Sequence, residues 1–366
     1  MAATRKNGTS PGRAHRGATS NAESTRFNLP SRELDGDWLD ARAAIDGEPV
    51  PVRTTVSLLK PKTIISYNKS PDVPFDRSIN TMVGCEHGCI YCFARPSHAY
   101  HDLSPGLDFE TKLFVKPDAA VLLRRELAKP GYRCAPIAMG TNTDPYQPIE
   151  AKWRITREVI EVLAACDHPL MITTKSNRVL RDLDLLVPMA QKDLVGVAIS
   201  ITSLDPRIAM TIEPRAPHPE RRLDAVRQLS EAGVPVYVNM APVIPAITDH
   251  EVETIVARAA AAGARDVSFI PVRLPWEVAP LFRAWLDTHF PERAGKVMAA
   301  IQSLRGGRDN DPGFFSRMRG QGPWADLLRT RFDIARRRNG IERVTGRMQL
   351  RTDLFRPPAG GQGELF

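Results

Sequence analysis

Six short apolar segments alternate with segments of helical periodicity along this 366-residue chain. The apolar segments are typical of buried strands and lie at residues 79–83, 136–140, 170–174, 194–200, 234–240 and 267–271. The helical segments lie at residues 119–128, 155–166, 179–190, 219–232, 249–262 and 276–290. Strands and helices that alternate at this spacing form right-handed units with parallel strands, so the sequence predicts an α/β fold. No Gly-rich dinucleotide-binding motif follows the first strand, which favours a partial (β/α)6 TIM barrel over a doubly wound sheet.

The order of these segments predicts three parts. Residues 1–35 are rich in Gly, Ser, Asn, Arg and Ala without periodicity, which is typical of a disordered basic arm or of an arm that docks late. Residues 36–275 contain all the predicted strands and form the expected barrel core. Residues 276–366 carry apolar side chains at helical spacing, so we expect a helical C-terminal extension with a basic tail. This extension would close the open side of the incomplete barrel.

The sequence also indicates the cellular compartment. No apolar run reaches the roughly 18 residues that a membrane-spanning helix needs, and residues 1–28 lack the apolar core of a secretory signal. Five cysteines in a chain of this length are too few for a disulfide-stapled secreted domain. We therefore expect a cytoplasmic protein without membrane contact, whose thiols stay reduced.

Positive charge is concentrated at the two ends of the chain. Residues 1–35 carry six Lys and Arg against three acidic residues, and residues 301–366 carry thirteen Arg against seven. The residues between them are almost neutral, although the whole chain has a formal net charge of +8. Basic ends can contact nucleic acid phosphates, but a solvated basic tail is the commoner explanation. Nucleic acid is therefore one candidate partner.

Cys85, Cys89 and Cys92 lie within eight residues, directly after the first apolar segment. Three thiolates from one loop suit a soft metal or an iron–sulfur cluster, and the lack of a fourth cysteine nearby leaves one coordination position open. The alternative is a structural zinc ion completed by His87 or His98. Structural zinc sites usually combine two separated ligand pairs, and the sequence supplies no second pair.

The spacing Cys-x3-Cys-x2-Cys, with an aromatic residue before the last cysteine, resembles the signature of the radical S-adenosylmethionine (SAM) superfamily. Residues 80–93 and the later strand ends most resemble the spore photoproduct lyase-like branch, also described as DNA repair photolyase-like. The resemblance implies a [4Fe-4S] cluster held by Cys85, Cys89 and Cys92, with SAM on the fourth iron. It further implies an enzyme that cleaves SAM reductively to a 5′-deoxyadenosyl radical, with lyase-like but unspecified chemistry. A reductant protein such as flavodoxin or ferredoxin would supply the electron.

In a barrel, the residues that follow the strands share one mouth at the carboxyl ends. Residues 140–147 follow the second apolar segment and offer backbone carbonyls and Asp144. This run resembles the family segment that receives the SAM amino group, although it lacks the usual Gly-Gly-Glu. An ordinary turn before Pro145 is the alternative for Asp144. Lys175 follows the third segment, where the lyase-like branch uses a lysine to contact the SAM carboxylate.

Three further residues are candidates for contacts with SAM. Ser200 ends the fourth segment and resembles the ribose contact of the family. Arg215 can offer two parallel hydrogen bonds to a carboxylate, but an ion pair with Glu213 is an equally good explanation. Tyr91 stands between two cysteines, where an aromatic ring can cover the adenine face and shield the cluster; core packing is its alternative.

Two departures from the lyase pattern bear on the substrate. Spore photoproduct lyases carry a hydrogen-donating cysteine near the end of the second strand, where residues 140–144 contain none, and Phe93 stands where they have a tyrosine. Cys134 and Cys166 precede strands, so we expect them at the amino-terminal face of the barrel, away from the chemistry. The resemblance therefore predicts a different, unidentified substrate, with a nucleic acid base as one candidate. The runner-up interpretation is a zinc-stabilised nucleic-acid-binding protein without catalysis.

Overall fold

A seven-stranded sheet forms the centre of the molecule. The computed structural model describes residues 16–18, 20, 21, 24, 26, 53–341 and 349–358. The strand order across the sheet is β10-β9-β8-β7-β6-β3-β2. In chain order these strands are β2 (Ile65–Tyr67), β3 (Arg77–Ile79), β6 (Ile137–Met139), β7 (Leu170–Thr174), β8 (Val195–Ser200), β9 (Val236–Val243) and β10 (Asp266–Pro271). Within this sheet, the strands β3, β6, β7, β8, β9 and β10 are parallel, whereas β2 pairs antiparallel with β3 at the edge.

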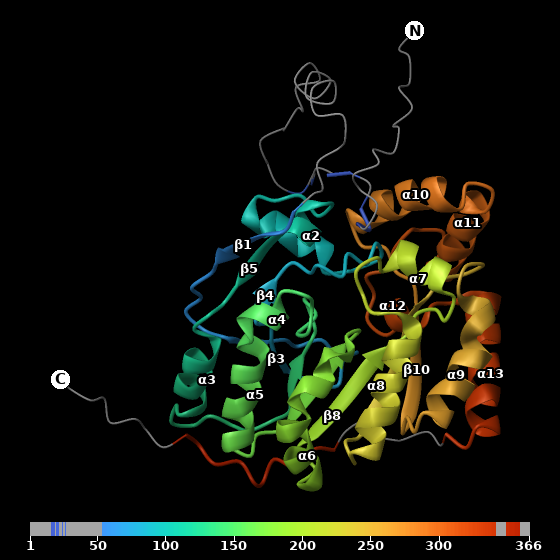
Figure 1. Ribbon diagram of the computed structural model, residues 1–366. Helices are drawn as coiled ribbons and strands as arrows, with labels where there is room; N and C mark the ends of the chain where they lie inside the picture. Colours follow the sequence, from blue (N-terminus) through green and yellow to red (C-terminus); the bar gives the residue numbers. More distant parts are fainter. Residues whose placement is uncertain are drawn as a thin grey trace.

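Helices cover the outer face of this sheet, as the alternation predicts (Figure 1). They are α3 (Ala119–Leu127), α5 (Ile155–Ala165), α6 (Leu183–Gln191), α8 (Pro219–Glu231) and α9 (Val252–Ala261). Each buries an apolar stripe; in α5, for example, Ile155, Val159 and Leu163 are buried, while Glu158 is exposed. In the described part of the chain the edge strands β2 and β10 pair with no further strand, so the predicted partial barrel is confirmed.

The first strand differs from its prediction. Residues 79–83 are predicted as one strand, but they are divided between β3 and β4 (Met82–Val83), which belongs to a different sheet. Asn80 explains the break. Its side-chain amide donates to Thr141 Oγ1 at 3.0 Å, and its Oδ1 accepts from the backbone amide of Asn142 at 2.9 Å. Asn80 therefore ties the end of β3 to the loop after β6 and interrupts the strand.

A second, three-stranded sheet leads into the cysteine segment. Its order is β1-β5-β4, with β1 (Thr55–Leu58) parallel and β4 antiparallel to β5 (Lys112–Val115). The short helix α2 (Asp108–Thr111) directly precedes β5. The sequence pattern does not predict this sheet, because strands of two to four residues are too short to show a clear alternation.

Helices close the open side of the barrel, which confirms the predicted helical extension. Among the described residues they are α10 (Val278–His289), α11 (Ala294–Leu304), α12 (Ser316–Arg319) and α13 (Gly322–Arg338). α13 packs on α9, and its Phe332 ring lies 4.7 Å from the ring of Phe269 in β10. The last turn of α13 is basic, where positive charge complements the helix dipole.

The inner faces of the parallel strands surround a cavity of about 1290 Å³. Its strand-side wall consists mainly of small or uncharged side chains, among them Ala138, Thr173, Ala198, Asn239 and Ser268. Residues of α12 and α13, with the segment 72–75, line the other side. The cavity is large enough for a small-molecule cofactor together with part of a substrate.

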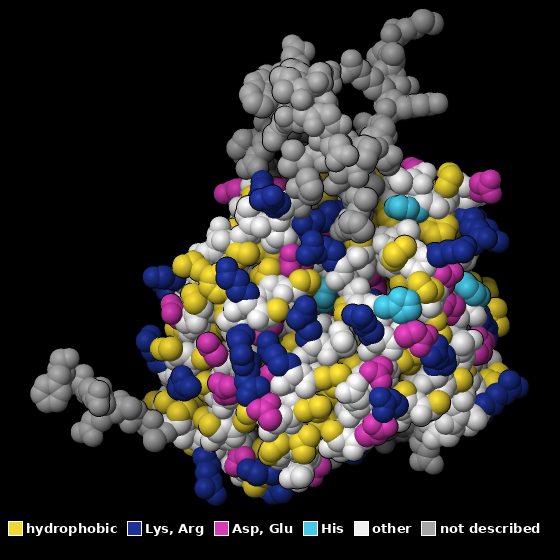
Figure 2. All heavy atoms as spheres, in the orientation of Figure 1, with side chains coloured by type: hydrophobic (Ala, Val, Ile, Leu, Met, Phe, Trp, Pro, Cys, Tyr) yellow, Lys and Arg dark blue, Asp and Glu magenta, His cyan; other side chains and the backbone are white. Residues whose placement is uncertain are grey.

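The outer surface mixes basic and acidic side chains. On the face shown in Figure 2, Lys and Arg alternate with Asp and Glu, and neither sign gathers into a single field. Within the described ranges, no helix is both long and apolar enough to cross a bilayer. On this face, therefore, no uniform positive field extends from the basic ends of the sequence.

Candidate active site

The cysteine loop joins β4 to the 3₁₀ helix η2 (Arg95–His101). Gly84 and Gly88 have φ angles of 77° and 67°, which a side chain rarely adopts, so the chain turns sharply at both. The Gly88 amide donates to the Cys85 carbonyl, and the Cys92 amide donates to the Cys89 carbonyl. Cys85 and Cys89 are buried, and Cys92 is half-buried. These turns confine the three thiols to one compact loop.

A buried ion pair holds the backbone of this loop. Arg95 Nε donates to the Cys89 carbonyl at 2.8 Å, and Nη2 donates to the Gly88 carbonyl at 3.0 Å. The same guanidinium lies 2.6 Å from Glu110 Oε1, with both side chains fully buried. Because a buried arginine needs a partner for its charge, Glu110 in α2 fixes Arg95 and, through it, the cysteine loop.

The N-terminal segment docks on the same acid. The amides of Gly17 and Ala18 donate to Glu110 Oε2 and Oε1 at 2.9 and 2.8 Å. Gly17 packs so closely that a Cβ at this position would lie 1.7 Å from the Gly88 carbonyl oxygen. Residues 16–18 are therefore docked, while most of the arm expected at residues 1–35 lies outside the described residues.

The surroundings of the thiols disfavour free thiolates. Burial raises the pKa of Cys89 to about 12, and the Lys175 ammonium offsets only part of this effect. Burial also raises the pKa of Cys85, and the Asp144 carboxylate and the neighbouring thiols raise it further. Thiols in such surroundings ionise when bound metal supplies positive charge, so this donor set fits an iron–sulfur cluster.

In the described residues, neither the cysteine triplet nor the zinc alternative has a preformed ligand set. In the part of the chain that the structure describes, no three His, Cys, Asp or Glu side chains gather closely enough to hold one metal ion. His98 Nε2 lies 2.9 Å from the Lys112 carbonyl, and its ring is edge-on to Phe109. His87 Nδ1 faces Asp144 Oδ2 at 3.3 Å. Within the described residues, Nδ1 of both rings has no hydrogen-bond partner, so a zinc ion completed by a histidine stays an alternative.

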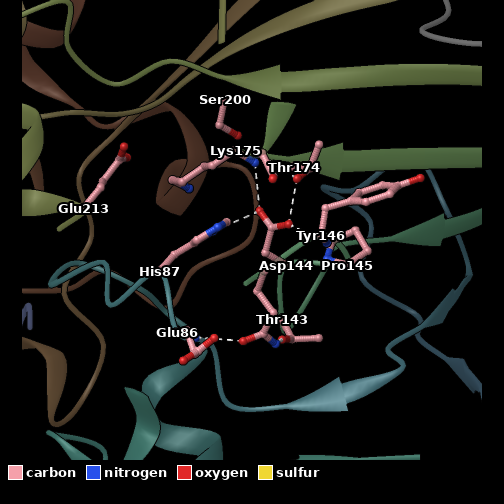
Figure 3. A network of polar contacts seen from close by, with 12 residues as sticks. Glu86, His87, Thr143, Asp144, Pro145, Tyr146, Thr174, Lys175, Ser200 and Glu213 are labelled. Atoms are coloured by element: carbon pink, nitrogen blue, oxygen red, sulfur yellow. Dashed lines mark hydrogen bonds and ion pairs between the residues drawn. The ribbon is translucent and has the colours of Figure 1, made fainter. Parts of the chain in front are cut away.

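Asp144 ties the loop after β6 to the end of β7 (Figure 3). Its Oδ1 accepts from the Thr174 hydroxyl at 2.6 Å and the Tyr146 amide at 2.9 Å, and its Oδ2 accepts from the Lys175 amide at 2.8 Å. Burial alone would raise its pKa, but the nearby His87 ring and these donors lower it to about 2. Both oxygens already have protein partners, so an ammonium group would have to share them. The predicted ammonium contact stays a prediction.

Lys175 extends from the end of β7 toward the cysteine loop. Its Nζ lies 5.7 Å from the centroid of the Tyr91 ring. Although burial opposes its charge, negative charge at Cys89 and on the Glu213 carboxylate raises its pKa above the ordinary value. Lys175 is therefore a fixed cation beside the predicted cluster ligands. Its contact with the SAM carboxylate stays a prediction.

Glu213 is a buried acid beside Lys175 and the cysteine loop. Its Oε2 lies 2.5 Å from Arg222 Nη1, and its Oε1 accepts from the Thr202 hydroxyl at 2.8 Å and from the Tyr91 hydroxyl. Burial would raise its pKa, but the charges of Arg222 and Lys175 lower it to about 2. Glu213 therefore fixes the Tyr91 ring and supplies a negative charge to Lys175.

The ion pair between Arg215 and Glu213, one of the two expectations for Arg215, is wrong. Arg215 Nη2 instead lies 3.1 Å from Glu86 Oε1, in the cysteine segment, while Glu213 pairs with Arg222. The Arg215 side chain is 33% exposed and that of Glu213 only 1%, so the two residues lie at different depths. Arg215 is thus a rim residue, and its contact with a SAM carboxylate stays a prediction.

Ser200 and Tyr91 lie where the sequence places them. Ser200 ends β8 and is buried, and its carbonyl accepts from Arg222 Nη1 at 3.2 Å. Tyr91 is buried in an apolar cluster that includes Cys89 and Ile90. The ribose role of Ser200 and the adenine role of Tyr91 stay predictions.

The other cysteines lie at the opposite end of the barrel, as expected. Cys134 precedes β6, and Cys166 follows α5 just before β7. The Cys166 carbonyl accepts from the Arg356 amide at 2.9 Å, so the C-terminal segment packs against this end. Neither thiol can reach the mouth.

Several residues that build the site were not singled out from the sequence. Arg222 gives a signal that could have found it, because it falls on the buried stripe of α8 next to Leu223 and Val226. A charge on an apolar stripe indicates a buried partner. Arg95 and Glu110 give no such signal, because their pairing depends on how a loop folds back on a short helix.

Known proteins are similar to this chain in sequence. The family model described as the radical SAM superfamily matches residues 79–259. The uncharacterized protein Rv2578c of Mycobacterium tuberculosis is 39% identical over 232 residues, which cover 62% of this chain and 68% of that protein. The uncharacterized protein MJ0683 of Methanocaldococcus jannaschii is 30% identical over 193 residues, covering 53% and 69%.

Solved structures of spore photoproduct lyase share the fold. The structure complexed with dinucleoside spore photoproduct has a TM-score of 0.56 at 16% identity, covering 90% of this chain and 87% of that one. A mutant with bound AdoMet and the dinucleoside has a TM-score of 0.53 at 15% identity, covering 87% and 85%. The family match includes the cysteine loop and the strands from β6 to β9, but ends before β10. The chain belongs to the radical SAM superfamily.

Proposed function

We propose that this protein cleaves SAM reductively with a single [4Fe-4S] cluster held by Cys85, Cys89 and Cys92. When bound, the cluster and SAM would supply the electron transfer that releases methionine and a 5′-deoxyadenosyl radical for hydrogen abstraction. The observation that carries this proposal is the fixed cation of Lys175 beside Cys89 and the Tyr91 ring. A ligand at the open coordination position would meet this cation with its carboxylate.

The side chains around the mouth have separate tasks in this proposal. Lys175 binds the SAM carboxylate, and Ser200 contacts the ribose. Asp144 receives the ammonium group together with the backbone carbonyls of its loop, which it also holds in place. Tyr91 covers the adenine face and excludes water from the thiols. Arg215 offers a second cation to a carboxylate from the rim.

Partners and substrate follow from the same chemistry. A reductant protein such as flavodoxin or ferredoxin would deliver the electron, and the cytoplasm would keep the thiols reduced. The basic ends of the sequence favour a nucleic acid substrate, and a structural neighbour binds dinucleoside spore photoproduct. Phe93 and the lack of a cysteine in residues 140–144 favour a substrate other than spore photoproduct. The reaction is therefore lyase-like in ancestry, with its product unassigned.

Metal analysis after anaerobic purification tests the proposal. We expect about four irons and four sulfides per chain and a broad visible absorbance. A colourless protein with one bound zinc would support the alternative of a zinc-stabilised nucleic-acid-binding protein. Reduction of the iron-loaded protein with SAM should yield 5′-deoxyadenosine, and a candidate substrate is recognised by a higher yield. Cluster-loaded protein that releases no 5′-deoxyadenosine would contradict the proposal.

A further inference from the structure

Arg273 is a half-buried cation at the mouth without an acidic partner. It follows β10, which ends at Pro271, and therefore lies at the carboxyl end of the barrel. Its guanidinium carbon is 4.9 Å from the centroid of the Phe93 ring, and Phe93 is the residue after Cys92. Among the residues that the structure describes, no hydrogen bond or ion pair reaches this guanidinium. Its charge is thus available to a ligand.

The other half-buried or buried arginines near the mouth differ in this respect. Each is engaged by a carboxylate or by backbone carbonyls: Arg95 by Glu110, Arg215 by Glu86, Arg222 by Glu213, Arg317 by Asp72, and Arg305 by carbonyls of residues 271, 272, 316 and 317. A partly desolvated charge without a partner opposes folding. Such a charge at a barrel mouth is typical of a site that receives an oppositely charged ligand.

Neighbouring charges do not neutralise Arg273. Burial lowers its pKa, and the positive charge of Arg317 lowers it further. Asp72 acts in the opposite direction, but its carboxylate is already bound by Arg317 Nε at 2.7 Å and Nη2 at 2.6 Å. The Phe315 amide donates to the same carboxylate at 3.2 Å. Asp72 is therefore the partner of Arg317 and does not pair with Arg273, while negative charge at Cys92 acts on Arg273 from the cysteine loop.

The backbone that carries Arg273 is held in place. Arg305 is buried, and its Nη2 donates to the carbonyls of Pro271 at 2.9 Å and Val272 at 2.8 Å. Ile270 and Phe315, on the two sides of this junction, line the barrel cavity. Arg273 thus stands on a rigid support beside Phe93, three residues beyond Ile270 of the cavity wall.

We propose that Arg273 binds an oxyanion of the substrate, a phosphate or a carboxylate, and thereby orients the substrate beside Phe93 and the cysteine loop. The identity of the reaction rests on the proposed function. Stacking on Phe93 occupies one face of the guanidinium and leaves its N–H edge free for two parallel hydrogen bonds. Lys175 faces the Tyr91 ring and Arg273 the Phe93 ring, so the proposal assigns the SAM carboxylate to Lys175 and the substrate oxyanion to Arg273.

Thermal unfolding under anaerobic conditions tests this assignment on the full, cluster-loaded chain. Wild type is compared with Arg273→Met in sodium phosphate, sodium acetate and sodium chloride at equal ionic strength. We expect phosphate or acetate to raise the wild-type midpoint by about 2 °C over chloride, and neither to raise that of Arg273→Met. The stronger anion identifies phosphate or carboxylate as the substrate group. Arg273→Lys should retain part of the response.

A matched variant separates binding from structure. Arg317→Met removes a paired arginine and leaves Asp72 without its partner, so its midpoint in chloride should fall. Arg273→Met removes an unpaired charge, so its midpoint in chloride should equal or exceed the wild-type value. A lower midpoint for Arg273→Met in chloride, or equal anion responses in wild type and variant, would overturn the proposal.

The affinity of Arg273→Met for SAM is a third measurement. If Arg273→Met weakened SAM binding tenfold, Arg273 would serve the cofactor, and the substrate assignment would be wrong. Iron, sulfide and 5′-deoxyadenosine measured on the same wild-type preparation decide the proposed function independently of the anion response. The anion-binding role of Arg273 can therefore fail while SAM cleavage is observed, and SAM cleavage can fail while the anion response is observed.

Discussion

The two ends of the barrel bury their polar groups in opposite ways. At the carboxyl end, Asp144 and Glu213 have pKa values that their partners lower to about 2, and both stay charged although burial opposes this. At the amino end, burial lowers the pKa of His168 to about 4, so its ring stays neutral near pH 7. The His168 ring is hydrogen-bonded on both sides, to the Tyr132 hydroxyl at 2.8 Å and the Pro169 carbonyl at 3.0 Å.

This difference indicates that the carboxyl end serves function and the amino end serves stability. A buried charge costs more free energy than a buried neutral group, even when it is paired. The amino end keeps His168 neutral and its buried Asp266 paired with Arg336 at 2.7 Å. It is covered by the C-terminal segment, whose Phe355 ring lies 5.2 Å from His168 and 5.5 Å from Tyr132. The carboxyl end accepts the cost where strand ends converge, as enzyme barrels do. Variants at the carboxyl end should thus change chemistry, and variants at the amino end should change stability.

The largest expected difference is between two cysteines. Cys89→Ala should abolish 5′-deoxyadenosine formation, because it removes one of the three proposed cluster ligands. Cys166→Ala lies at the other end, so it should keep full SAM cleavage and cost about 1 kcal/mol of unfolding free energy through a small cavity. Iron content, product yield and urea unfolding are measured for both. Full SAM cleavage by Cys89→Ala would disprove the ligand assignment.

Removal of the mouth cation should have the next largest effect. Lys175→Met leaves Glu213 with one cation fewer and removes the proposed contact to the SAM carboxylate. We expect the dissociation constant for SAM to rise about 100-fold, near 3 kcal/mol, as for other desolvated charge pairs. Equilibrium dialysis with labelled SAM measures it.

The matched control for Lys175 is an exposed lysine. Lys192 pairs with Asp167 at 2.6 Å in the turn after α6, and its side chain is 50% exposed. Lys192→Met should leave SAM binding unchanged. If Lys175→Met bound SAM as tightly as this control, the carboxylate contact would have to be assigned to another residue, with Arg215 as the first candidate.

The neutral histidine of the amino end makes stability depend on pH. The unfolded chain binds a proton at His168 below about pH 6.5, whereas the folded chain resists protonation until about pH 4. Because the folded-state pKa is the lower one, this contribution to stability is present above pH 6.5 and is lost as the pH falls through 4. It amounts to at most about 3 kcal/mol. His168→Gln removes the titration.

Urea unfolding at pH 7 and pH 4 measures this effect. The free energy of unfolding of wild type should fall by up to about 3 kcal/mol more than that of His168→Gln between the two pH values. The exposed His250→Gln should behave like wild type. Equal pH slopes for wild type and His168→Gln would mean that the ring does not stay neutral in the fold. SAM cleavage at pH 7 should be the same in all three proteins.

The sequence predicts the barrel better than it predicts the support of the mouth. The order of the apolar segments locates the parallel strands, because each strand is a continuous apolar run. The exception is the segment that Asn80 interrupts. Spacing alone predicts that the three cysteines hold one cluster, and this stays a prediction. The pairing of Glu213 with Arg222 depends on the path of the chain after β8, and no local pattern encodes it. Docking of Gly17 on Glu110 joins residues 93 positions apart, beyond the reach of any periodicity.

Disrupting this docking should have the smallest predicted effect. It changes only a support of the cysteine loop at the carboxyl end and removes no proposed ligand of the cluster or of SAM. Gly17→Ala would place a methyl group against the Gly88 carbonyl and push the segment away from Glu110. We expect the cluster to be lost to a chelator about fivefold faster, near 1 kcal/mol, and amides of residues 84–93 to exchange hydrogen faster. Visible absorbance and mass spectrometry measure the two quantities.

Gly295→Ala is the matched control, because its methyl group meets no atom within 4 Å and lies in the exposed first turn of α11. It should keep the wild-type rate of cluster loss. If Gly17→Ala unfolded like wild type and also kept its cluster as long as Gly295→Ala, the N-terminal segment would not support the loop. The loop would then be held by its other contacts: the buried pair of Arg95 and Glu110, the Cys85 amide on the carbonyl of Phe109 in α2, and the pair of Arg215 and Glu86.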